Sequence, residues 1–308
     1  MAVLAIRAII WTFQRKPYQR IHRYRSRFNT STYFQVLLDA ADLCWNFRGI
    51  GWSWSRLPNH LEPPSSLTFT FLSFLFHVIL TDVAHRLVQI FGPDTLGSVV
   101  GGTIFDPSLP PLHRYSRSTI ITLISGFTIY ASIQTTYLFF ALFSRVVLCH
   151  SPSQWPPLFN HPWLSTSVSQ FWSNGWHQLH RDVFISFGAN PLIPFMGRVG
   201  GVLGAFFLSG VLHTLGLWGM GRGGEFIKVT GFFMMMAVGV LLEYSWKHLT
   251  GSRVDGFFGR VWTSIWLLGW GQILIDAWST KGLIGIVFFP VGYRPSDYIL
   301  HWWIKKAG

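Results

Sequence analysis

The sequence predicts an all-α protein, a polytopic transmembrane helix bundle with an interfacial or re-entrant segment near residues 150–195. Of its 308 residues, 50% are hydrophobic and only 12% are charged, whereas soluble domains carry about 25% charged residues. The mean hydropathy is positive. The apolar residues also form long uncharged runs, which are typical of membrane spans.

Residues 1–66 form a predicted N-terminal basic and interfacial region. Met1 to Phe13 is a short apolar stretch broken by Arg7, and it lacks a convincing small-residue cleavage site. We therefore predict no secretory signal and interpret the stretch as an interfacial anchor or the tail of a truncated first helix. The cations that follow it are Arg15, Lys16, Arg20, Arg23, Arg25 and Arg27.

The net charge of +12 raises the question of nucleic-acid binding. A basic segment beside apolar spans more often faces anionic lipid on the cytoplasmic side of a membrane, or is simply a solvated juxtamembrane loop. We therefore predict membrane lipid as a partner and no nucleic acid.

The two cysteines, Cys44 and Cys149, lie far apart and form no CxxC motif. This spacing disfavours a disulfide framework, a zinc site and a redox pair. We predict that both are packing residues.

Residues 67–308 form the predicted transmembrane domain. A helix needs about 20 apolar residues to cross the hydrocarbon core. The longest uncharged runs lie between Arg117 and Arg145 and between Arg198 and Arg222. These two runs predict two membrane-spanning helices.

The remaining predicted spans are shorter. Leu67–Leu80 is strongly apolar and is followed by Asp82, His85 and Arg86, which we place at the membrane rim or in the bundle interior. Further candidates are Val229–Leu242, Val261–Ile275, Leu283–Val291 and Leu87–Phe105, of which the last two are interrupted by Pro290 or by Asp94 and glycines. The total is about five to eight spans in a single domain.

The segment from His150 to Phe195 is rich in Pro, Ser, Trp and His. It is too polar for a simple span and too aromatic for an ordinary loop. Non-helical backbone at membrane depth is tolerated only against protein or a wet cavity. We therefore predict an amphipathic interfacial or re-entrant element.

His213 is the only titratable residue inside the apolar run between Arg198 and Arg222. An ionisable residue in a span is costly and usually faces the bundle interior or a cavity. Its ordinary pKa suits a general base. A core histidine hydrogen-bonded to a neighbouring helix is the equally simple structural alternative.

A second polar cluster, FWSNGWHQLHRD, covers residues 171–182. His177 and His180 are three residues apart, so on a helix they share a face. That geometry is compatible with a metal, but a site needs three or four ligands and the sequence offers no obvious third. We predict no metal; rim histidines and a snorkelling Arg181 are the structural alternative.

A third element, NFRGIGWSW, covers residues 46–54. Its two glycines beside an arginine predict a turn or a tight backbone approach. The chain has no phosphate-binding glycine loop and no GxSxG nucleophile motif.

Taken in order, these elements resemble a known family. NFRGIGWSW, HPWLSTSVSQFWSNGWHQLHRDVFISFGANPL, FFLSGVLHTLGLWG and GFFGRVWTSIWLLGWGQ are similar to the wax-synthase-like branch of membrane-bound O-acyltransferases. Within it they resemble fungal members that acetylate terpenoid or meroterpenoid alcohols in secondary metabolism. The resemblance covers roughly Asp42 to Trp278.

The resemblance implies acyl transfer from acyl-CoA, with acetyl-CoA favoured as co-substrate, to a lipophilic alcohol. It implies no bound cofactor. The intramembrane histidine of the family falls on His213, the implied catalytic base, and His177 is the implied second catalytic residue, where many relatives carry Asn. The implied substrate-binding residues are Asn174, Trp176, Arg181 and Ser209.

The sequence departs from the family at its FWxRRW pattern, where it has Asn174 and Gly175 in place of basic residues. A CoA-phosphate contact from these two positions is therefore in doubt, and Arg181 is the candidate to take it over. A membrane-embedded tunnel with a basic cytosolic mouth would bring polyanionic CoA and the lipophilic acceptor together.

Three alternatives stay open. Within the enzyme class, a long-chain alcohol as acceptor would make the protein a wax ester synthase. A transporter would line a polar pathway with His213, Asp82, His85 and Arg86, although the halves show no matching broken helices. An inactive scaffold is the third. The many spans and the absence of a cleaved signal suggest the endoplasmic reticulum.

Overall fold

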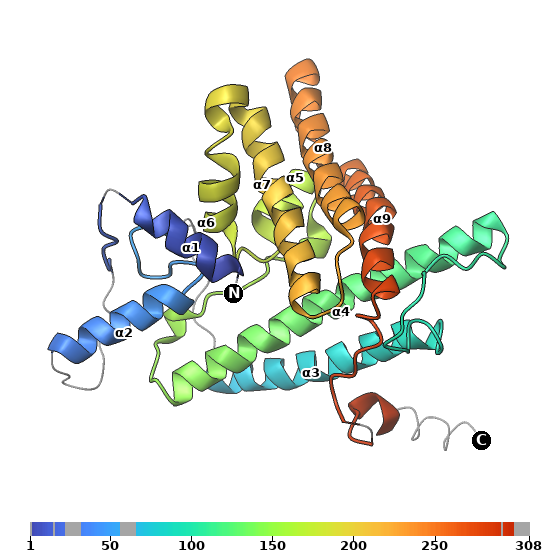
Figure 1. The fold of residues 1–308 in the computed structure, drawn as a ribbon, viewed down its shortest axis with the longest axis horizontal. Coiled ribbons are helices and arrows are strands. Elements are labelled where there is room, and N and C mark those ends of the chain that lie inside the picture. The colour runs from blue at the N-terminus through green and yellow to red at the C-terminus, as the bar shows by residue number, and fades with distance from the viewer. Residues whose placement is uncertain (1, 15, 22–31, 56–65, 291, 299–308) are drawn as a thin grey trace. The chain divides into compact units, whose positions relative to one another are not determined.

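The computed structural model describes residues 2–14, 16–21, 32–55, 66–290 and 292–298. Figure 1 shows the helices in chain order: α1 (Ala2–Thr12), α2 (Thr32–Trp45), α3 (Leu67–Ile90), α4 (Pro111–Val146), α5 (Val168–Gln170), α6 (Arg181–Val183), α7 (Ile193–Gly219), α8 (Phe226–Thr250) and α9 (Gly256–Thr280). Short turns of other helical types are η1 (Pro152–Gln154), η2 (Pro162–Leu164), η3 (Phe171–Gly175) and η4 (Phe184–Ala189).

The predicted all-α class is confirmed. The described residues contain no strand, only one isolated bridge between Arg20 and Trp52. Of the predicted basic segment, Arg15, Arg23, Arg25 and Arg27 lie outside the described residues.

Helices α3, α4, α7 and α8 are long and apolar enough to cross a membrane, with 24, 36, 27 and 25 residues. They contain the predicted runs beginning at Leu67, Arg117 and Val229, and α7 contains the run beginning at Arg198 as far as Gly219. Helix α9 contains Val261–Ile275 and also has 25 residues, but its tryptophans, glycines and polar residues make it less apolar. A polytopic helical membrane protein is therefore confirmed.

Two of the shorter predicted spans are wrong. The start of Leu87–Phe105 belongs to α3, which ends at Ile90, and the residues up to Pro110 form turns. The described part of Leu283–Val291 also forms turns. The backbones of the two stretches pack closely: a Cβ on Gly285 would lie 2.0 Å from the Ser98 carbonyl oxygen.

Both cysteines are free, as expected, but they differ in exposure. Cys44 is half-buried and Cys149 is exposed, so the predicted packing role of Cys149 is wrong. Cys149 lies just beyond the end of α4, where the chain has already turned with a positive φ of 54°.

The chain forms two compact units. The first comprises Met1–Leu67, Phe140–Leu212 and Phe233–Thr263, and the second comprises Thr68–Phe139, His213–Phe232 and Ser264–Gly308. Four long helices, α4, α7, α8 and α9, contribute residues to both units. The division by sequence at residue 66 stays a prediction.

The second unit has an apolar core of five buried residues, namely Val88, Leu96, Ile104, Ile121 and Ile275. Within this unit α3 and α4 lie side by side (Figure 1), with His77 Nε2 3.4 Å from the Tyr130 hydroxyl. The loop between them is fixed by Asp276, whose Oδ1 accepts hydrogen bonds from Thr103 Oγ1 at 2.6 Å and from the Ile104 amide at 3.1 Å. Lys228 pairs with the other oxygen of Asp276 at 3.0 Å.

The polar end of α3 lies in the interior, one of the two positions that we predicted. Asp82 is fully buried, and its carboxylate accepts hydrogen bonds from Arg294 Nε at 2.9 Å and from the Ser296 amide at 2.7 Å. Arg294 also donates to Gln89 Oε1 at 3.0 Å. His85, which is 3% exposed, lies 2.6 Å from the Ile284 carbonyl oxygen. These contacts fasten the segment after α9 to α3.

In the first unit, two glycines allow close backbone contact between η4 and α7. A Cβ on Gly204 would lie 2.1 Å from the Gly188 carbonyl oxygen, and a Cβ on Gly188 would lie 2.7 Å from the Gly204 carbonyl oxygen. Small residues at such positions are characteristic of membrane helix packing.

Arg294→Ala should lower the free energy of unfolding by about 3–5 kcal/mol, because it leaves the buried Asp82 carboxylate without its cation. Thermal unfolding in detergent micelles measures this. Lys281→Ala is the matched control: Lys281 pairs with Glu225 at 3.1 Å, but both side chains are more than a quarter exposed. Its loss should cost about 0–1 kcal/mol, and equal losses would contradict the interpretation.

Gly204→Val should destabilise the first unit by about 1–3 kcal/mol, because the added side chain would overlap the η4 backbone. Gly231→Ala in α8 is the control, since a Cβ there meets no atom within 4 Å. Alanine at that helical position should be neutral or stabilising by about 1 kcal/mol. If the Gly204→Val protein had the same melting temperature in detergent as the wild type, the η4 and α7 backbones would not be in contact.

Candidate active site

The FWSNG part of the polar cluster forms a widened helical turn. Ser167 caps the start of the helix, accepting a hydrogen bond from the Gln170 amide at 3.0 Å. The helix begins as α5 and continues as the π-helical η3, in which the Trp176 amide donates to the Phe171 carbonyl five residues earlier at 2.7 Å. The second π-helical stretch, η4, follows α6. Turns of this type occur frequently at functional sites.

Aromatic rings surround this motif helix, which we define as residues Val168–Gly175. Trp176 stacks on Phe171 with ring centroids 5.4 Å apart and meets the edge of Phe159 at 5.1 Å. Trp172 lies edge-on to Phe206 of α7 at 5.9 Å. Trp176 is thus packed into an aromatic cluster, as large rings with offset and edge-to-face geometry favour.

His177 and His180 lie in different aromatic surroundings. His177 is half-buried and meets the Phe159 ring edge-on at 5.8 Å. His180 packs against Phe47 at 5.5 Å. No three His, Cys, Asp or Glu side chains in the described part of the chain are grouped so as to hold a metal ion.

The C-terminal end of the motif helix is held by two polar side chains. Gln178 Nε2 donates to the carbonyl oxygens of Trp172 at 3.0 Å and Trp176 at 2.7 Å. Arg181 Nη1 donates to the Ser173 carbonyl at 3.0 Å. These groups satisfy carbonyls that a helix end leaves without partners, and a cation is favourable there. Asn174 is exposed, and the substrate contacts of Asn174 and Arg181 stay predictions.

The N-terminal end of the motif helix is held by Glu243 of α8. Its carboxylate accepts hydrogen bonds from the amides of Val168 at 2.6 Å and Ser169 at 2.9 Å. Trp262 Nε1 of α9 donates to the same carboxylate at 2.9 Å. Glu243 was not predicted as a site residue, because its only signal in the sequence is a lone acid at the end of an apolar run.

The NFRGIGWSW element, residues 46–54, lies in the first unit. Gly49 has a φ of +66°, and a Cβ there would lie 2.8 Å from the Trp54 ring, which confirms the predicted tight approach. The neighbouring Arg48 is buried and donates to the carbonyl oxygens of Pro156 and Pro157, each at 2.9 Å. Arg48 thus joins the NFRGIGWSW element to the loop that leads into the motif helix.

His213 lies on α7, half-buried, with the Trp278 ring stacked 6.4 Å away at an interplanar angle of 19°. Ser209, 7% exposed, precedes it by one helical turn, so the two residues share a face of α7. His177 belongs to the first unit and His213 to the second. Their meeting in one cavity therefore stays a prediction.

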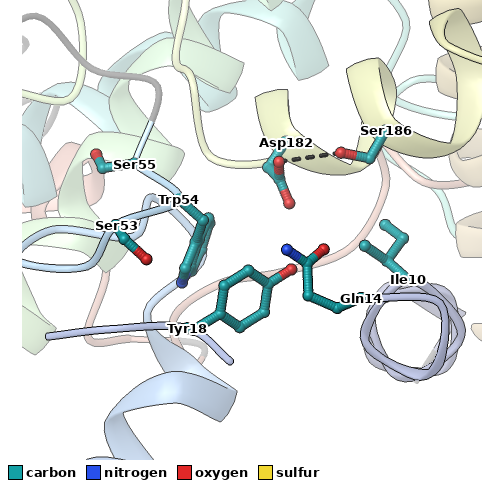
Figure 2. A pocket seen from close by; sticks show the side chains of 8 residues that line it. All are labelled: Ile10, Gln14, Tyr18, Ser53, Trp54, Ser55, Asp182 and Ser186. Carbon is teal, nitrogen blue, oxygen red and sulfur yellow. Dashed lines mark hydrogen bonds between the residues drawn. The ribbon is translucent and has the colours of Figure 1, made fainter. Parts of the chain in front are cut away.

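Figure 2 shows a pocket of the first unit, about 300 Å³ in volume and lined by Ile10, Gln14, Tyr18, Ser53, Trp54, Ser55, Asp182 and Ser186. Ser186 donates to Asp182 at 3.1 Å, and Figure 2 places this pair opposite Tyr18 and Gln14. A second pocket of about 340 Å³ is lined by Tyr244, Ser245, His248 and Leu249. None of the predicted site residues lines either pocket.

A buried arginine holds helix α1, which contributes Ile10 to the pocket of Figure 2. Arg7 of α1 is 3% exposed and donates to the carbonyl oxygens of Leu43 at 2.8 Å and Asn46 at 3.2 Å. Burial lowers the pKa of its guanidinium, and the charge of Asp182 opposes that shift. Arg7 therefore fastens α1 to α2 rather than facing solvent.

The region that contains His177 and His213 is similar to known proteins. Residues 155–235 match the Membrane bound O-acyl transferase family. The chain is 27% identical over 238 residues to "Acetyltransferase ple2" of Rhodocybe pseudopiperita, covering 72% of this chain and 61% of that protein. It is 29% identical over 135 residues to "Acetyltransferase atnC" of Arthrinium sp, covering 39% of this chain and 31% of that protein.

A plant protein is also similar. "Long-chain-alcohol O-fatty-acyltransferase" of Simmondsia chinensis is 28% identical over 106 residues, which cover 32% of this chain and 30% of that protein. The matches thus span less than two thirds of the length of each of these relatives. The resemblance to membrane-bound O-acyltransferases is confirmed: residues 155–235 of this chain match that family.

Proposed function

We propose that the protein is an acyl-CoA-dependent O-acyltransferase of the membrane. In this proposal it transfers acetyl from acetyl-CoA to a hydroxyl of a lipophilic acceptor, a terpenoid or meroterpenoid alcohol of secondary metabolism. The observation that carries the proposal is the family match over residues 155–235, which contains both His177 and His213. The acetyltransferase names of the fungal relatives favour acetyl as the acyl group.

His213 is the proposed general base. An alcohol becomes an effective nucleophile when its proton is accepted as it attacks, and a histidine suits that step. The alcohol oxygen forms a bond to the thioester carbonyl carbon while His213 takes the hydroxyl proton. The C–S bond of the tetrahedral intermediate then breaks, and the CoA sulfur leaves with the electron pair and receives the proton. The products are an ester and free CoA.

His177 is the proposed second active-site residue. A polar N–H group placed near the carbonyl oxygen would stabilise the negative charge that develops on it, or would orient the acceptor hydroxyl. The rings of Phe159 and Trp176, which also contact each other, pack against the His177 ring with centroids 5.8 and 5.7 Å away. Trp176, Asn174, Arg181 and Ser209 are proposed to contact substrate.

The proposed setting is the endoplasmic reticulum membrane. Four helices of spanning length and apolarity would place the reaction inside the bilayer, where a lipophilic acceptor concentrates. CoA is polyanionic and would enter from the aqueous side.

Long-chain-alcohol acylation, giving wax esters, is the second candidate function. It is favoured by the similarity to the Simmondsia chinensis protein. The two functions differ in the donor and the acceptor, so one assay separates them.

His213→Ala should lower the rate of ester formation by about 10²–10⁴-fold, because the general base is removed. Microsomes containing the protein would receive labelled acetyl-CoA or palmitoyl-CoA with a panel of terpenoid and fatty alcohols. His113→Ala, which removes an exposed histidine at the start of α4, is the control and should retain wild-type activity. An ester undiminished in His213→Ala would make His213 a structural residue.

His177→Asn should retain activity within about tenfold of the wild type, whereas His177→Ala should lose about 10²–10³-fold, because asparagine still supplies an N–H donor. Initial rates with the best donor and acceptor measure both variants. Equal losses in the two variants would show that the imidazole itself, rather than a hydrogen-bond donor, is required.

A further inference from the structure

Glu243 is a buried carboxylate with an unusual set of partners. It is 7% exposed and accepts three N–H hydrogen bonds, two from the backbone of Val168 and Ser169 and one from the Trp262 indole. Within the described residues no cation pairs with it. Burying a carboxylate is unfavourable unless hydrogen bonds replace its water, and these three donors supply such bonds.

The position of Glu243 along the motif helix is also specific. The first N–H groups of a helix have no partners inside it, and the helix dipole favours an anion there. The same helix has the Arg181 cation and the Gln178 amide at its C-terminal carbonyls. The motif helix is therefore held at both ends by groups of the favourable sign.

A close backbone contact strengthens this arrangement. A Cβ on Gly259 of α9 would lie only 2.3 Å from the Thr166 carbonyl oxygen, just before the motif helix begins. Helix α9 supplies this contact and the Trp262 donor, while α8 supplies the carboxylate. Helix α8 thus binds the two residues that begin the motif helix, and α9 packs against Thr166 just before them.

We propose that Glu243 is a positioning residue for the acyl transfer proposed above, on which this inference rests. Its carboxylate fixes the N-terminal end of the motif helix on α8 and α9. Because the motif helix continues into the π-helical turn η3, the position of its N-terminal end also determines the position of its C-terminal end. Trp176 and His177 follow directly after that end. Glu243 touches neither substrate nor the reacting atoms in this role; it acts through the placement of His177.

Glu243→Gln is the sharpest variant, because it keeps the size of the side chain. An amide has one acceptor oxygen and one donor nitrogen, and three N–H donors converge on this site. At least one of the three N–H groups would then face the amide N–H₂ group, which is also a donor. The repulsion between the two donors displaces the start of the motif helix. We expect kcat per folded molecule to fall about 10- to 100-fold, as misplacement of a site by about 1 Å does, while KM for acyl-CoA changes less than about threefold. Trp262→Phe removes one donor and leaves both backbone bonds, so a smaller loss is expected.

Two readouts test the proposal on purified protein in detergent. The first is kcat and KM of Glu243→Gln, Trp262→Phe and the wild type, scaled to the folded fraction. The second is amide hydrogen exchange of residues 165–180, which needs no substrate. Asp82→Asn is the matched control, since Asp82 is another buried carboxylate that accepts a backbone amide, and its loss should reduce the folded fraction without lowering kcat per folded molecule.

The expected result is faster exchange in residues 168–175 of Glu243→Gln together with the fall in kcat. Unchanged exchange there would overturn the proposal, because the carboxylate would then not anchor the helix. A reduced folded fraction with normal kcat would overturn it too, since Glu243 would then be purely structural. If the wild type forms no ester with any substrate pair, the proposed function fails, and the exchange measurement alone decides whether the anchor exists.

Discussion

Buried carboxylates on long helices hold the irregular segments of this protein. Asp82 on α3 accepts the Ser296 amide, Asp276 on α9 accepts the Ile104 amide, and Glu243 on α8 accepts the amides at the start of the motif helix. In a bilayer, non-helical backbone has no water to bond with, so every such group needs a partner within the protein. A carboxylate is well suited because it accepts several hydrogen bonds at once. Each of these acids therefore joins one long helix to one irregular segment.

The same constraint explains how a short, irregular stretch can carry a site. The motif helix is only two turns long and contains a π-helical turn, so its own hydrogen bonds define its position poorly. Its geometry comes from outside: aromatic rings around Trp172 and Trp176, polar groups at both ends, and the Arg48 bonds to Pro156 and Pro157 ahead of it. Fixed surroundings of this kind are what a site for oriented reactants requires.

Much of the fold follows from the sequence, because an uncharged run of about 20 residues has few alternatives to a spanning helix. This reasoning located α3, α4, α7, α8 and α9. It failed at Leu87–Phe105 and Leu283–Val291, because turns with close backbone contacts can be as apolar as a span: Gly101 and Gly285 each allow such a contact there. The motif residues were visible in the sequence, but Glu243 was not. Its partners are backbone amides 74 and 75 residues earlier, and a backbone amide leaves no mark in a sequence pattern.

The π-helical turns also bear on how this region tolerates change in chain length. Stretches η3 and η4 lie on either side of His177 in the chain, and a π turn contains one more residue than the α turn it replaces. Deleting one residue from Phe171–Gly175 would remove the extra residue and leave a regular α turn, after which the chain continues in the same direction. His177 would then keep its place in the register of the chain. A π turn can therefore absorb a one-residue change of length that a regular helix would transmit as a rotation to every residue after it.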